Sequence, residues 1–101
     1  MKIYVSVDME GIAGILLPEQ LKKGGLLYEE ARKLLTAEVN VVIEGLIEAG
    51  AEEIYVKDAH GTGYNFIASE LHHGARYCMG HSAVGVWNRC RSYKLINFKS
   101  Y

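Results

Sequence analysis

The chain has 101 residues, a length that corresponds to one small domain. Apolar residues make up 50% of it and charged residues 23%, which excludes a disordered chain, and no apolar run is long enough to cross a membrane. The net charge of −1 excludes a strongly basic protein, so we expect neither nucleic acid nor a membrane as a partner.

The charges are unevenly distributed along the chain. All 12 acidic side chains lie within residues 1–70, whereas the charged residues of 71–101 are all basic: Arg76, Arg89, Arg91, Lys94 and Lys99. No helical or strand period runs through the segment after residue 80. We therefore expect residues 1–80 to form an N-terminal α/β portion and residues 81–101 to form a basic, aromatic tail without an assignable fold.

The first predicted elements are a strand over residues 2–8 and a long helix over residues 28–49. The strand alternates Ile3, Val5 and Val7 with other strand-forming residues, a pattern typical of a strand covered on both faces. The helix carries one apolar stripe at spacings of three and four residues, formed by Ala31, Leu35, Val39, Val42, Leu46 and Ala49. Gly50 follows it as a C-terminal cap.

Two more strands are predicted over residues 53–58 and 75–79. A strand, a helix and a second strand form a βαβ unit, whose strands are parallel and whose crossover is right-handed. The fold class is therefore α/β, a three-layer-type βαβ unit with one long helix. We expect Tyr4, Tyr55 and Tyr77 on the face that this helix leaves uncovered, which favours self-association.

Two strand ends carry nearly the same pattern, Asp8-Met9-Glu10-Gly11 and Asp58-Ala59-His60-Gly61. Ligands bind at the carboxyl ends of parallel strands, so these side chains converge if the two strands are neighbours. A divalent cation would relieve the repulsion between the carboxylates, and mixed oxygen and nitrogen ligands suit Zn²⁺. The alternative is that each Asp only caps its own turn.

These motifs resemble the zinc-dependent D-aminopeptidases of the bacterial dipeptide-operon type. The resemblance lies in residues 1–14, MKIYVSVDMEGIAG, in residues 56–61, VKDAHG, and in residues 70–76, and it extends to about residue 80. It implies that Asp8, Glu10 and His60 bind a pair of zinc ions. It also implies an α/β fold, release of N-terminal D-amino acids from short peptides by metal-activated water, and a homo-oligomeric ring. We expect Asp58 to support the ligands without binding metal.

Members of that family are longer, and their remaining zinc ligands and catalytic His lie beyond the matching stretch. We therefore expect a truncated form of a larger family fold, with little activity by itself and no residue assignable to the catalytic His. Two alternatives stay open: a Mg²⁺-dependent phosphatase of the haloacid-dehalogenase type, with Asp8 as nucleophile, or a non-catalytic remnant. Two cysteines without CxxC spacing and the lack of signal-peptide features favour the cytoplasm.

Overall fold

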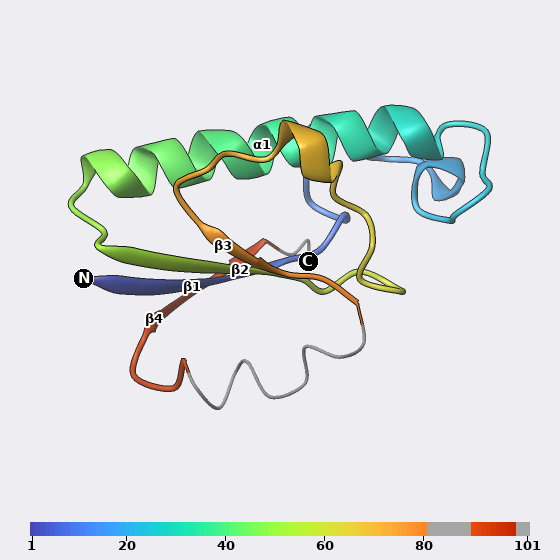
Figure 1. Cartoon of the computed structure of the whole chain (residues 1–101). Helices are drawn as coiled ribbons and strands as arrows, with labels where there is room; N and C mark the ends of the chain where they lie inside the picture. Colours follow the sequence, from blue (N-terminus) through green and yellow to red (C-terminus); the bar gives the residue numbers. More distant parts are fainter. Residues whose placement is uncertain (81–89, 99–101) are drawn as a thin grey trace.

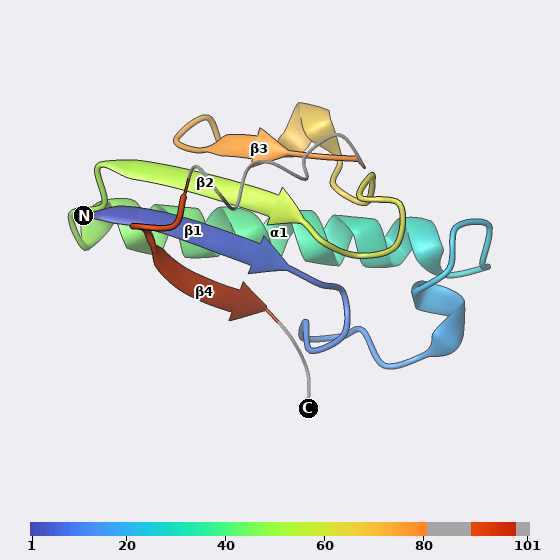
Figure 2. The ribbon, with the colours of Figure 1, turned by 90° about the horizontal axis from the view of Figure 1, so that it is seen from below.

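The protein contains a four-stranded sheet with one long helix packed along it (Figures 1 and 2). The structure, a computed structural model, describes residues 1–80 and 90–98. Its strands are β1 (Lys2–Val7), β2 (Glu53–Asp58), β3 (Arg76–Cys78) and β4 (Lys94–Phe98), and its helix α1 spans Tyr28–Glu48. Two short 3₁₀ helices, η1 (Pro18–Gln20) and η2 (Ala68–Glu70), lie in the connections. No helix in the described ranges has the length and apolarity needed to cross a membrane.

The sheet is parallel throughout and has the order β3-β2-β1-β4. This strand order confirms the parallel α/β class and the prediction that the first two strands lie next to each other. The third strand is shorter than the predicted range of 75–79. The strand β4 is not predicted at all, because its pairing with β1, for example Val5 with Ile96, comes from tertiary structure rather than from its own pattern. Residues 81–89 and 99–101 of the predicted tail lie outside the described residues.

The core lies between α1 and one face of the sheet. Three residues of the predicted stripe, Ala31, Leu35 and Val39, are buried against the sheet, and the stripe then continues through Ile43 rather than Val42. The sheet contributes a matching apolar layer: Ile3, Val5, Val7, Ile54 and Val56. This packing fixes the position of β1 and β2 relative to the helix, and therefore the position of the loops that follow the two strands.

The end of α1 has the predicted glycine cap. Gly50 adopts a φ of 97°, which a residue with a side chain rarely adopts. Its N–H donates to the Ile47 carbonyl at 3.0 Å, and the Ala51 N–H donates to the Leu46 carbonyl at 2.9 Å. These two bonds form a Schellman motif, which turns the chain back toward β2.

The expected placement of three tyrosines is only partly right. Tyr77 is paired with the core residue Val56 and therefore faces α1, where its ring packs edge-on against Phe66 at 6.2 Å. On the opposite face, Tyr4 is buried and Tyr55 packs against Tyr93 at 5.9 Å. The prediction was wrong for Tyr77 because its face is set by the register that pairs it with Val56, and the residues of β3 do not by themselves indicate that register.

Candidate metal centre

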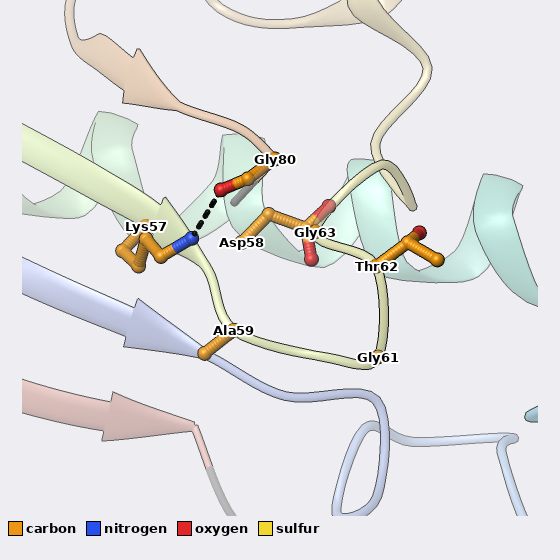
Figure 3. Close-up of a pocket in the computed structure, with 7 residues that line it drawn as sticks. All are labelled: Lys57, Asp58, Ala59, Gly61, Thr62, Gly63 and Gly80. Atoms are coloured by element: carbon orange, nitrogen blue, oxygen red, sulfur yellow. Dashed lines mark hydrogen bonds between the residues drawn. The ribbon is translucent and has the colours of Figure 1, made fainter. Parts of the chain in front are cut away.

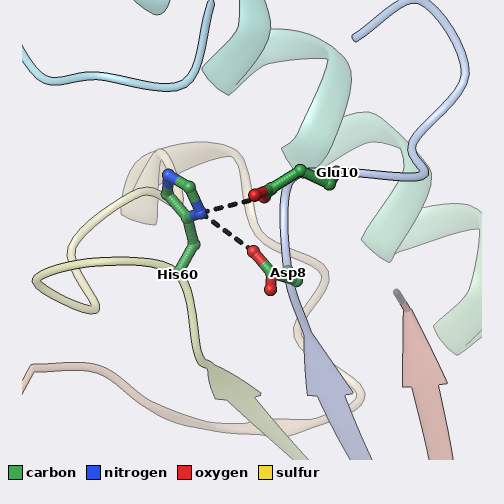
Figure 4. A group of neighbouring side chains, drawn as sticks. All are labelled: Asp8, Glu10 and His60. Atoms are coloured by element: carbon green, nitrogen blue, oxygen red, sulfur yellow. Dashed lines mark hydrogen bonds and ion pairs between the residues drawn. The ribbon is translucent and has the colours of Figure 1, made fainter. Parts of the chain in front are cut away.

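The three predicted ligands converge at the carboxyl end of the sheet (Figure 4). Val7 and Asp58 are register partners at the ends of β1 and β2, and the Ala59 N–H donates to the Val7 carbonyl at 2.8 Å. The two loops therefore leave the sheet side by side. Asp8 and Glu10 extend from the first loop and His60 from the second, so the parallel register itself brings the three side chains together.

The ligand atoms lie close enough to share one ion. His60 Nδ1 is 2.8 Å from Asp8 Oδ1 and 3.2 Å from Glu10 Oε1. One ligand atom from each residue lies within 4.8 Å of the others, and within residues 1–80 and 90–98 no other three His, Cys, Asp or Glu side chains come this close. His72 and His73, which are adjacent to each other in the sequence, are not part of this group.

The burial of His60, Asp8 and one oxygen of Glu10 favours a cation, although the Glu10 side chain as a whole is 45% exposed. The His60 side chain is 16% exposed and the Asp8 side chain 29%. Glu10 Oε1 is buried and accepts no hydrogen bond. Its contact with His60 Nδ1 is close enough for an ion pair but lacks the geometry of a hydrogen bond. A buried carboxylate oxygen without a donor is costly, and a divalent cation among these oxygens would satisfy it. Two carboxylates and an imidazole are also ligands that Zn²⁺ accepts, so the residues present fit the metal.

The electrostatics of the metal-free group favour the protonated form of His60. Burial by itself would raise the pKa of Asp8, but contacts with Glu10, His60 and the Met9 N–H outweigh it and hold that pKa below its usual value. Burial would lower the pKa of His60, yet its contacts with the Leu21 carbonyl and the two carboxylates raise it. Zn²⁺ would therefore compete with a proton for the same nitrogen.

Asp58 is not one of the three converging side chains; it holds the loop that carries His60. Its carboxylate is fully buried. Oδ2 accepts the N–H groups of Asn65 at 2.6 Å and Phe66 at 3.2 Å, and Oδ1 accepts the Asn65 side-chain amide at 2.9 Å and the His60 N–H at 3.4 Å. Asp58 thus binds backbone and amide groups rather than facing the three ligands.

Asn65, Tyr28 and Arg32 complete this support, and sequence reasoning missed all three. The Asn65 amide also donates to the His60 carbonyl at 2.6 Å, and the Tyr28 hydroxyl donates to Asn65 Oδ1 at 2.5 Å. Arg32 donates to the backbone carbonyls of Asn65 at 3.0 Å and Phe66 at 2.9 Å. No motif marks these residues, because two belong to α1 and act on the loop only through the fold.

A pocket lies beside the same loop and is lined by Lys57, Asp58, Ala59, Gly61, Thr62, Gly63 and Gly80 (Figure 3). Lys57 Nζ donates to the Gly80 carbonyl at 3.1 Å. Gly63 has a φ of 80°, and a Cβ at this position would lie 2.7 Å from the Gly80 nitrogen. The glycine therefore permits the loop to cross the end of β3. Asp8, Glu10 and His60 do not line this pocket.

Comparisons with known proteins agree with this geometry. The model of the D-aminopeptidase family matches residues 1–86. A D-aminopeptidase of Bacillus subtilis is 38% identical over 72 residues, which cover 71% of this chain and 26% of that protein. The solved structure of the Zn-dependent D-aminopeptidase DppA from Bacillus subtilis, described as a self-compartmentalizing protease, matches with a TM-score of 0.78 and 36% identity. That match covers 80% of this chain and 30% of that one, so the chain spans less than a third of these relatives. The chain belongs to the D-aminopeptidase family.

Proposed function

We propose that the chain carries zinc-binding residues of a metallo-aminopeptidase that releases N-terminal D-amino acids from short peptides. The observation that carries the proposal is the convergence of Asp8, Glu10 and His60 in a chain of this family. Bound Zn²⁺ would supply Lewis acidity, which activates water and polarises a peptide carbonyl. The two carboxylates and His60 Nδ1 would hold the ion, while Asp58 would hold the His60 loop.

We further propose that the 101-residue chain has little peptidase activity by itself. Three ligands suffice for one zinc ion with an open position, whereas the family resemblance implies two ions and further ligands. Membership of the D-aminopeptidase family favours this function over the phosphatase alternative.

Calorimetric titration with Zn²⁺ tests the ligand set. We expect the wild-type chain to bind at most one ion, and Asp8→Asn and Glu10→Gln to weaken binding at least about tenfold, because ligand count sets affinity. Glu48→Gln, which removes an exposed carboxylate at the end of α1, is the matched control and should bind normally. Equal affinity in all four proteins would refute the proposed site.

Hydrolysis of D-Ala-D-Ala by the zinc-loaded chain tests the second point. We expect little turnover. Clear turnover that disappears in Asp8→Ala would show that this chain is an active enzyme and would contradict the expected inactivity. Zinc binding without any turnover would leave the chain a metal-binding, non-catalytic form, which is the second candidate function.

We also propose that the protein forms a homo-oligomer and acts in the cytoplasm. Several large apolar side chains are exposed, among them Leu16 at 86% and Leu26 at 94%, and contacts between copies would cover such residues. Sedimentation velocity should show a concentration-dependent shift to larger species, and a monomer at all concentrations would contradict the proposal. The cytoplasm is proposed from the low cysteine content, and cell fractionation tests it.

A further inference from the structure

The two ring nitrogens of His60 have different partners. Nδ1 faces Asp8 and Glu10, whereas Nε2 lies 2.7 Å from the Leu21 carbonyl oxygen. A carbonyl oxygen can only accept a hydrogen bond, so Nε2 must carry the proton in this contact. In the neutral ring, the lone pair is then on Nδ1, the nitrogen that points at the two carboxylates.

Gln20 closes the loop that ends at Leu21. Gln20 is 5% exposed, and its side chain makes three hydrogen bonds within its own loop. Oε1 accepts the N–H groups of Leu16 and Leu17, both at 2.7 Å, and Nε2 donates to the Gly14 carbonyl at 2.8 Å. The Leu21 N–H donates to the Pro18 carbonyl at 3.0 Å and closes the last turn of this segment.

We propose that Gln20 is a positioning residue for the metal centre: by closing the loop of residues 14–21 it holds the Leu21 carbonyl against His60 Nε2 and so presents Nδ1 to the metal. The inference rests on the proposed function, because it takes His60 to be a zinc ligand. A hydrogen bond at the distal nitrogen fixes the tautomer and ring orientation of a ligating histidine, and loss of such a partner costs 10–100-fold in metal affinity.

Three variants test the role of Gln20. Gln20→Met keeps the length of the side chain and removes all three hydrogen bonds. Gln20→Glu keeps acceptors for Leu16 and Leu17 but places a carboxylate oxygen against the Gly14 carbonyl, so it disturbs one of the three contacts. Asn40→Ala is the matched control, because Asn40 also ties a loop through two hydrogen bonds, to the Glu70 carbonyl at 2.7 Å and from the His72 N–H at 2.8 Å.

Nitrogen-15 NMR of the histidine rings reports the tautomer, and calorimetry reports zinc affinity. In the metal-free wild type at alkaline pH we expect the Nε2-protonated form of His60, and in the zinc-loaded protein a bond through Nδ1. Gln20→Met should mix the tautomers and weaken zinc binding about tenfold, and Gln20→Glu should cause part of both effects. Asn40→Ala should lower the urea midpoint without changing either readout.

Several results would overturn the inference. Zinc bound through Nε2, an Nδ1-protonated ring in the metal-free protein, or unchanged tautomer and affinity in folded Gln20→Met would each refute it while leaving the proposed function intact. Should Gln20→Met fail to fold, Gln20→Glu decides: a partial loss of the tautomer preference and of zinc affinity there supports the role of the loop, and no effect on either refutes it. A wild type that binds no zinc would overturn the proposed function as well.

Discussion

Replacing Asp58 with Asn probes the buried network that holds the His60 loop. Asn keeps one acceptor oxygen and turns the other into an amide that faces two donors. The Oδ2 contacts with the Asn65 and Phe66 N–H groups, at 2.6 and 3.2 Å, are on average shorter than the Oδ1 contacts at 2.9 and 3.4 Å, so the new amide should take the Oδ1 side. A compensating flip of the Asn65 amide is blocked, because it would place an oxygen against the His60 carbonyl, now 2.6 Å from Nδ2.

The expected cost is about 3 kcal/mol, since one good hydrogen bond to a charged acceptor and part of a second are lost and their donors stay buried. That is a large share of the stability of a small domain. Urea unfolding followed by circular dichroism should show a lower midpoint with an unchanged slope. Glu48→Gln serves again as the exposed control. A change of less than about 0.5 kcal/mol in Asp58→Asn, typical of an unconstrained surface site, would refute the reasoning.

Three further predictions concern stability, each read from urea midpoints. The Asp8–His60 contact should stabilise the metal-free chain most between pH 3.8 and 6.5: the lowered pKa of Asp8 gives stability that is lost as pH falls, and the raised pKa of His60 gives stability that is lost as pH rises. A midpoint difference between wild type and Asp8→Asn that is independent of pH would contradict this. Gly63→Ala should cost more than Gly24→Ala, roughly 3 against 1 kcal/mol, because both have positive φ but only Gly63 lacks room for a Cβ; equal costs would argue against the described crossing. Leu35→Ala should cost about 2–5 kcal/mol at its fully buried position, and a cost below about 1 kcal/mol would show that the core is packed differently.

The features that could be predicted from the sequence have a local cause. The alternation of β1, the period of α1 and the cap at Gly50 each follow from residues close together in the chain. The convergence of Asp8, Glu10 and His60 was also predictable, because a βαβ unit places two consecutive parallel strands side by side with their ends at one edge.

The features that were missed depend on contacts between distant segments. The strand β4 has a weak pattern of its own and becomes a strand through its pairing with β1. Tyr28 and Asn65 are 37 residues apart, and a single buried hydrogen bond joins them. The partner of His60 Nε2 is a backbone carbonyl, that of Leu21, and no residue type in a sequence marks which carbonyl will accept such a bond.

A crystal structure of the chain grown with Zn²⁺ tests the central claim most directly. Anomalous diffraction at the zinc edge locates the ion without reference to any assumed ligand. We predict a peak between the carboxylates of Asp8 and Glu10 and Nδ1 of His60, within about 2.0–2.2 Å of each ligand atom. A zinc peak elsewhere, for example at His72 and His73, with none among these three residues, would contradict it.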